Sequence, residues 1–272
     1  MRDYYDDMMD YHHIKVVRKD SIYRKLLRWA IAIIVTLIFV VFQRSTGPTS
    51  AEQGIIITDN REYSLAFPRT MTTDDPTITL KTKNQTATGV IHWKTHKSNE
   101  AYQVIRMTNN ADYNLEAKLP NKQKLDKIEY FAVVDGIPIF TNEPLILRYK
   151  DPVPAIWLIL HVFLIFMAML FAIYCIILSI RQPDSMKKYV IMTLWCLLSG
   201  GLIFGAIVQK YAFGVYWSGF PLGCDITDNK TLVAFLAVAG SLFFRNKTYF
   251  RYIAIASLVI MLAIFCIPHS IG

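Results

Sequence analysis

The sequence predicts a membrane protein: an α-helical transmembrane bundle of five spans with an inserted extracytoplasmic all-β sandwich domain. Three observations predict this fold class. Hydrophobic residues make up 53% of the 272 residues, whereas soluble domains are about 45–50% apolar even when glycine is counted. The apolar surplus lies on both sides of residues 43–153, which read like a soluble domain and contain no cysteine. Basic residues gather in the short segments between the apolar runs.

The apolar runs define the expected spans, since a membrane-crossing helix needs roughly 20 apolar residues. The polar residues 1–25 precede the first run and set it apart from a cleaved secretory signal, so we expect an uncleaved anchor. Residues 154–272 form the expected four-helix part of the bundle. The predicted spans are residues 26–42, 155–180, 189–208, 231–244 and 252–268, of which 231–244 is short for a crossing.

The distribution of lysine and arginine predicts the orientation, because cytoplasmic loops are enriched in these residues. With five crossings, all three strongly basic segments fall on one side: residues 1–28, 181–188 and 245–251. The opposing loop 209–230 carries only Lys210 and Lys230. We therefore expect a cytoplasmic N-terminus, with the β domain and the C-terminus outside the cytoplasm. The single-pass entry, the lack of cysteine in residues 43–153 and the short loops favour a bacterial inner membrane.

The central region shows short β-like runs that alternate with turn signals, which is typical of a sandwich. The runs lie at 78–83, 89–95, 102–107, 127–136 and 145–150. Residues 55–150 resemble an Ig-like or fibronectin type III module, in which Trp93 would be the core tryptophan and Tyr130 would lie near the tyrosine-corner position. This resemblance implies a module that binds or spaces other proteins. The prolines of the Asp151-Pro152-Val153-Pro154 joint indicate limited movement against the bundle.

The most distinctive polar segment is the loop at 209–231, which combines aromatic residues and glycines with polar side chains. One interpretation is an interfacial loop, because tyrosine and tryptophan favour the headgroup region, with Thr227 or Asp228 as the N-cap of the next helix. The other is a loop that folds back over the bundle and places carboxylates at a polar cavity. The residues of interest in the loop are Trp217, Cys224, Asp225, Asp228, Asn229 and Lys230.

Two histidines extend the second interpretation into a cofactor hypothesis. His161 lies within a predicted span, about 10 Å from its outer end, and His269 lies at the outer end of the last span. Imidazole pairs bind haem or transition metals, and carboxylates with histidine bind zinc. We therefore treat His161 and His269 as candidate cofactor ligands, with Cys224, Asp225 and Asp228 as candidate metal ligands. The alternative is that His161 hydrogen-bonds a neighbouring helix and His269 is solvated.

The third predicted span contains a group of small residues, Ser199, Gly200, Gly201 and Gly205. Small residues let membrane helices approach closely, so this group predicts packing within the bundle or with a partner subunit. A helix break that lines a substrate path is the alternative.

Charge and motifs limit the function classes. The net charge of +8 is explained by lipid headgroups rather than nucleic acid, since no basic patch is interleaved with aromatic residues. No P-loop, dinucleotide fingerprint, serine elbow or HExxH motif is present.

Three functional hypotheses follow. The first hypothesis is a non-enzymatic accessory or scaffold subunit that binds protein partners in the membrane or periplasm. The second is a redox or metal-handling protein. The third is a hydrolase or transferase that uses Asp225 and Asp228.

Overall fold

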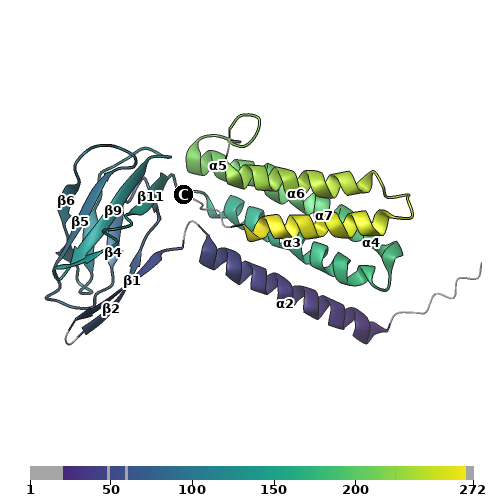
Figure 1. The fold of residues 1–272 in the computed structure, drawn as a ribbon, viewed down its shortest axis with the longest axis horizontal. Coiled ribbons are helices and arrows are strands. Elements are labelled where there is room, and N and C mark those ends of the chain that lie inside the picture. The colour runs from purple at the N-terminus through teal and green to yellow at the C-terminus, as the bar shows by residue number, and fades with distance from the viewer. Residues whose placement is uncertain (1–20, 48–49, 59–60, 224, 268–272) are drawn as a thin grey trace, which may run out of the picture.

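A computed structural model of the protein describes residues 21–47, 50–58, 61–223 and 225–267. A β-rich domain and a helical bundle are joined end to end, with the helices running along the long axis of the molecule (Figure 1). The chain enters through helix α2 (Ile22–Thr46), forms the β domain and then builds the rest of the bundle. This order confirms the prediction of a β domain inserted between apolar helices.

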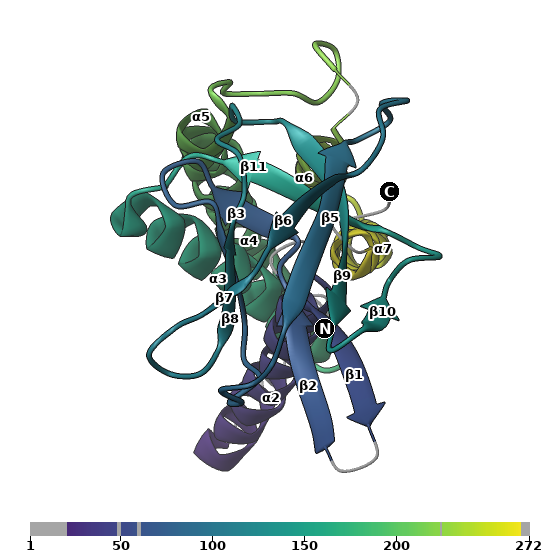
Figure 2. The same ribbon diagram turned by 90° about the vertical axis from the view of Figure 1, so that its left-hand side faces the viewer.

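The described part of the β domain contains three sheets. The strands are β1 (Glu52–Thr58), β2 (Arg61–Phe67), β3 (Thr70–Thr72), β4 (Thr77–Leu80), β5 (Gly89–Thr95), β6 (Gln103–Arg106), β7 (Thr108–Asn109), β8 (Leu115–Lys118), β9 (Lys127–Val134), β10 (Ile137–Ile139) and β11 (Leu145–Lys150). A six-stranded sheet runs β3-β11-β9-β5-β6 with β10 paired to β9, and a three-stranded sheet runs β4-β8-β7. The hairpin β1–β2 forms a sheet of its own beside them (Figure 2).

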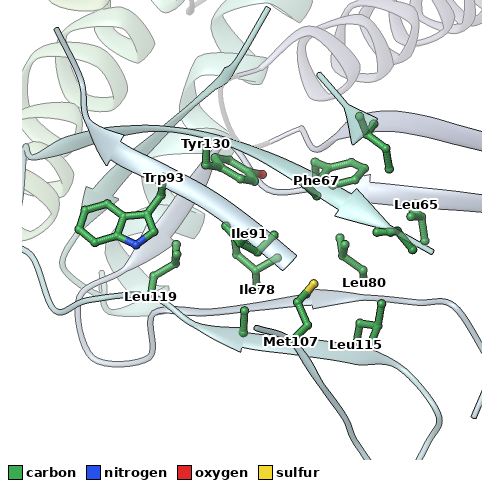
Figure 3. Close-up of a cluster of buried hydrophobic side chains, with 14 of the residues drawn as sticks. Leu65, Phe67, Ile78, Leu80, Ile91, Trp93, Met107, Leu115, Leu119 and Tyr130 are labelled. Carbon is green, nitrogen blue, oxygen red and sulfur yellow. The ribbon is translucent and has the colours of Figure 1, made fainter. Parts of the chain in front are cut away.

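The core of the β domain lies between these sheets. Alternate residues of β5 and β9 are buried, because successive side chains of a strand point to opposite faces of the sheet. Trp93 on β5 and Tyr130 on β9 are cross-strand partners, and both are buried. Ile78, Leu80 and Leu115 of the smaller sheet meet them from the other side (Figure 3).

Tyr130 makes a different contact from the one that the resemblance implies. In a tyrosine corner the hydroxyl bonds to the backbone a few residues upstream. Here the Tyr130 hydroxyl donates to the carbonyl oxygen of Pro68 at 2.7 Å, 62 residues away in the sequence. The reason is that the chain between β2 and β3 passes over the buried ring. Burial raises the pKa of this hydroxyl well above its usual value.

The bundle follows the β domain. Its helical segments are α3 (Ala155–Ser179), η2 (Pro183–Ser185), α4 (Met186–Cys196), η3 (Leu197–Phe204), α5 (Gly205–Phe213), α6 (Ile226–Leu242) and α7 (Phe250–Cys266). Among the described residues, three helices are long and apolar enough to cross a membrane: α2 with 25 residues, α3 with 25 residues, and the continuous run Pro183–Phe213 with 31 residues. The prediction of five spans is therefore wrong in number, and three helices meet the requirement.

The two remaining predicted spans form shorter helices. Helices α6 and α7 have 17 residues each, or about 25 Å, against a hydrocarbon core of about 30 Å. The first turn of α6 is polar because it contains Asp228, Asn229 and Lys230. Helix α7 ends at Cys266, and the sequence continues Ile267-Pro268, where the proline disfavours a helical conformation of the residue before it.

Helix α2 is held against the bundle by aromatic contacts near its start. The Trp29 ring stacks on Tyr174 of α3 at 4.0 Å between centroids, and its edge meets Tyr189 of α4 at 6.3 Å. Offset-stacked and edge-to-face pairs each add about 0.5–1.5 kcal/mol beyond the area they bury. Toward its other end α2 exposes Leu37, Ile38 and Val41, which is the surface expected of a lipid-facing helix.

The junction between the β domain and the bundle is hydrogen-bonded. The backbone N–H of Asp151 donates to the carbonyl oxygen of Ala212 at 3.0 Å, and the Arg148 guanidinium lies 4.3 Å from the centroid of the Phe213 ring. The Asp151 carboxylate accepts from the Thr73 hydroxyl at 2.7 Å and from the Lys124 ammonium at 3.0 Å. One aspartate therefore joins the end of the β domain to the end of α5.

We expect this junction to loosen in acid. Hydrogen bonds from Thr73 and Lys124 hold the pKa of the Asp151 carboxyl below its usual value. A carboxyl with a lowered folded-state pKa stabilises the fold above its unfolded-state pKa, about 3.9, and loses that contribution as the pH falls through the folded-state pKa. Deuterium uptake at residues 209–214, corrected for the intrinsic rate, should rise below about pH 4 in the wild type. The Asp151→Asn variant should lack this rise, and flat wild-type uptake would contradict the assignment.

Candidate functional site at the bundle end nearest the β domain

The loop between α5 and α6 lies at the bundle end nearest the β domain (Figure 1). Most of the residues that the sequence singles out belong to this loop or to the start of α6. His161, on α3, lies against the segment η3. Its Nδ1 is 2.8 Å from the carbonyl oxygen of Gly200. Because a carbonyl oxygen only accepts, Nδ1 carries the proton in the neutral ring, and the Nε2 lone pair is left as the acceptor or ligand position. Neutral imidazole in this tautomer is the form that binds metals through Nε2.

The segment η3 is a π-helix of eight residues between the α-helical segments α4 and α5. Its wider turn is visible in one bond: the N–H of Gly205 donates to the carbonyl oxygen of Gly200, five residues earlier. The Gly200 carbonyl oxygen therefore accepts two hydrogen bonds, one from the Gly205 N–H and one from the His161 Nδ1–H. π-helical turns are rare and are enriched at functional sites, and the His161–Gly200 contact lies in this one.

Gly200 and Gly201 of η3 lie where neighbouring groups leave no room for a side chain, and Gly205 at the start of α5 lies in tight contact with a neighbouring ring. A Cβ on Gly200 would come within 2.6 Å of the Leu164 Cβ, and a Cβ on Gly201 within 2.5 Å of the Thr231 Cγ2. A Cβ on Gly205 would lie 3.3 Å from the His161 ring. These three glycines thus contact α3 and α6 of the same chain. Ser199 instead donates to the Trp195 carbonyl oxygen at 2.7 Å within its own helix.

The loop between α5 and α6 is organised by Asp228. Its carboxylate oxygen Oδ2 accepts from the Ser218 N–H at 2.6 Å, the Ser218 hydroxyl at 3.2 Å and the Gly219 N–H at 3.1 Å. Asn229 adds a contact, since its Oδ1 accepts from the Phe220 N–H at 2.7 Å. Gln209, in the middle of α5, donates to the Ser218 hydroxyl. The loop therefore folds back over the start of α6 and is fixed by side chains of that helix.

The N-cap of helix α6 is Asp225. This corrects the interfacial-loop interpretation, which expected Thr227 or Asp228 as the cap. The Asp225 Oδ1 accepts from the N–H groups of Thr227 at 2.8 Å and Asp228 at 3.2 Å. Asp228 does not complete a capping box, in which its side chain would bond back to the N–H of the cap residue, because its Oδ2 accepts from Ser218 and Gly219 and the Asp225 N–H donates to the Ser218 carbonyl oxygen. Aspartate is itself a preferred N-cap residue, so the residue type at 225 was the available sequence signal.

The other predicted residues of the loop have identifiable places. The Trp217 Nε1 donates to the Phe220 carbonyl oxygen at 3.0 Å, and Lys230 is buried and donates to the Ile267 carbonyl oxygen at 2.6 Å. Cys224 and His269 lie outside the described residues. Within the described ranges, no three His, Cys, Asp or Glu side chains are grouped so that they could hold a metal ion. The carboxylates of Asp225 and Asp228 both accept bonds from the loop and helix backbone.

Two contacts in this region have no sequence signal. Nothing in the order of residues pairs His161 with Gly200, 39 positions apart, or Gln209 with Ser218 across the loop. Both arise from the way α3, η3 and the loop pack together. No protein-family model and no curated protein matches this chain.

Proposed function

We propose that this chain is a membrane-anchored accessory subunit that binds other envelope proteins through its β domain. The observation that carries the proposal is the hairpin β1–β2, which leaves two large apolar side chains on its outer face. Ile55 is 64% exposed and Ile57 is 76% exposed, while Ile56 between them is buried in the core. An outward apolar face on a two-stranded sheet with open edges is a surface for association with another protein.

The anchoring of the β domain also supports this role. The hydrogen bonds of Asp151 and the Arg148–Phe213 contact fix the domain to the end of the bundle, so a bound partner would be held at a set position over the membrane. The fibronectin type III-like character of the domain fits the same role. The glycines of η3 already pack against α3 and α6 of the same chain. The proposal therefore does not depend on them for contacts with a partner.

The proposed orientation places the β domain outside the cytoplasm of a bacterial inner membrane. The three basic segments support it: the start of α2, the α3–α4 turn and the α6–α7 turn all lie at the end of the bundle opposite the β domain (Figure 1). Cytoplasmic loops are the ones enriched in lysine and arginine. The cytoplasmic side is therefore the end with Arg24, Arg181 and Arg245.

The test is purification from native membranes with mild crosslinking. We expect the wild-type protein to retain further polypeptides in constant ratio. The variants Ile55→Lys and Ile57→Lys should reduce their recovery at least about tenfold, because burying an unpaired ammonium in an apolar interface costs well over 1.4 kcal/mol. The matched control is Thr79→Lys, which adds the same charge at an exposed position of β4. Equal recovery from all variants would reject the hairpin as the binding surface.

A second candidate function rests on His161. We propose as the alternative a membrane redox or metal-handling protein, in which His161 Nε2 is a ligand of haem or a transition metal near the outer end of the bundle. Metal-binding histidines almost always donate their other ring N–H to a carbonyl or carboxylate, and His161 has that partner in Gly200. His269 remains the predicted second ligand.

An absorption spectrum with elemental analysis tests the alternative. If it holds, the mildly purified protein shows a Soret band or a metal near one equivalent, and His161→Ala removes it. His161→Gln, which keeps a donor for Gly200, separates loss of a ligand from loss of the hydrogen bond: it should remove the metal but preserve the fold. A featureless spectrum without stoichiometric metal would reject this candidate.

A further inference from the structure

The β domain contains a groove at the corner where its two main sheets separate. The strand that begins as β6 in the larger sheet passes through Met107 and continues as β7 in the smaller sheet. The groove lies between β6 and the segment that follows β8, and its volume is about 510 Å³. Gln103, Val104 and Ile105 form one wall, Lys118, Leu119 and Pro120 form the other, and Trp93 also lines it.

The β6 wall is an open edge of the sheet. β6 is the last strand of its sheet and pairs only with β5 among the described strands. The Met107 N–H donates to the Gly89 carbonyl oxygen at 2.8 Å, and the register places Ile91 opposite Ile105. Hydrogen-bonded pairs alternate along an antiparallel ladder, so the peptide groups of Val104 and Arg106 point away from β5. Because no described strand lies on that side of β6, these groups can pair with an added strand.

Trp93 supplies a donor that has no acceptor. Its side chain is only 6% exposed, and its Nε1 has no hydrogen-bond partner among the described residues. Leu119 of the groove wall lies beside it in the core (Figure 3). A buried indole N–H without a partner costs about 1–3 kcal/mol, and an acceptor brought in by a ligand would recover that cost. This observation is independent of the open strand edge and also points to an occupant.

The charges around the groove are basic. Lys118 lines it, and the Lys122 ammonium lies 5.6 Å from the centroid of the Trp93 ring. Arg106 is exposed at the end of β6. The nearby Glu116 carboxylate already accepts from Asn110 at 2.8 Å and Thr79 at 3.4 Å. The groove therefore favours an acidic ligand.

We propose that this groove binds an extended, acidic segment of a partner protein, which adds a strand to the edge of β6. The added backbone pairs with Val104 and Arg106, as in other cases where a peptide extends a sheet. Its carboxylates face Lys118 and Lys122, and one of its oxygen atoms accepts from the Trp93 indole. The inference rests on the proposed role of the β domain in partner binding, and it names a surface separate from the hairpin face.

The test uses the full-length protein in nanodiscs of zwitterionic lipid at about 150 mM salt. At this ionic strength the Debye length is about 8 Å, so charges farther apart than this are largely screened. The probes are fluorescein-labelled decapeptides of alternating glutamate and valine or alternating lysine and valine. We expect saturable binding of the acidic peptide and none of the basic peptide. The double variant Lys118→Glu, Lys122→Glu should weaken binding at least tenfold, whereas Lys81→Glu, Lys83→Glu changes the same charge elsewhere and should leave it unchanged.

A backbone variant tests the strand pairing separately. Val104→Pro removes an N–H that points away from β5, and proline is tolerated at such edge positions. It should abolish peptide binding while the protein stays folded. The proposal is overturned if the acidic peptide does not bind, or if it binds the Lys118/Lys122 variant or Val104→Pro as well as the wild type. Partners that persist in native membranes after such a failure would leave the accessory role intact and exclude only this groove.

Discussion

Replacing Gly200 with alanine should separate the π-helical segment η3 from helix α3 and destabilise the bundle. The added Cβ would lie 2.6 Å from the Leu164 Cβ and 3.1 Å from the Ile165 backbone nitrogen. A backbone atom cannot move aside as a flexible side chain does, so the two helices must shift. Overpacking of this kind costs about 1–3 kcal/mol and at times more. The shift would also stretch the contact between His161 and the Gly200 oxygen.

Gly240→Ala is the matched control for this prediction. Gly240 lies near the end of α6, and a Cβ there would have nothing within 4 Å. Alanine is favoured over glycine within a helix by about 0.5–1 kcal/mol, so this variant should be neutral or stabilising. Thermal unfolding in detergent, followed by size-exclusion recovery, measures both. Equal midpoints for Gly200→Ala and the wild type would show that the helices are not in close contact.

Asp228→Ala should release the loop between α5 and α6. The substitution leaves the N–H groups of Ser218 and Gly219 and the Ser218 hydroxyl without their shared acceptor. A fully buried donor left unsatisfied costs about 1–3 kcal/mol, and because these donors are partly buried, each should cost toward the lower end of that range. The free energy that favours the folded loop over open conformations should fall by their sum. Hydrogen exchange of peptides that cover residues 214–223 should become markedly faster, while exchange in the middle of α3 stays unchanged.

Two further variants define the reason for that loss. Asp228→Asn retains an oxygen acceptor and should give an intermediate effect. Asp225→Ala removes only the helix cap and should cost about 1 kcal/mol, with faster exchange at the start of α6 rather than at Ser218. If Asp228→Ala leaves loop exchange unchanged, the carboxylate does not organise the loop, and its availability for chemistry would have to be considered again.

The sequence predicted the architecture of the chain at a coarse level. Long apolar runs indicated the helices that are now α2, α3 and Pro183–Phe213, because length and hydropathy are sufficient signals for a membrane helix. Alternation of apolar residues located the strands around Trp93 and Tyr130. The number of spans was overestimated because the apolar runs at 231–244 and 252–268 are shorter than the roughly 20 residues that a crossing needs. The helices that contain them, α6 and α7, have only 17 residues each.

The candidate site was predictable only where local spacing determines the contact. The start of α6 was located to within three residues, since the expected cap was Thr227 or Asp228 and the observed cap is Asp225. The cluster of small residues around Gly200 indicates close packing. The π-helical turn and the His161–Gly200 hydrogen bond depend on how α3 lies against η3, which a single sequence does not specify. The hydrogen bond from Tyr130 to Pro68 likewise depends on the path of the chain between β2 and β3.

The most direct test of the accessory role is the size and composition of the native complex. The protein should be extracted from its own membrane in mild detergent after crosslinking in intact cells, and then resolved by native electrophoresis and mass spectrometry. The proposed function predicts a species larger than the single chain, with other polypeptides in fixed ratio that are lost from the Ile57→Lys variant. A wild-type protein that migrates as a single chain without crosslinked partners would contradict it.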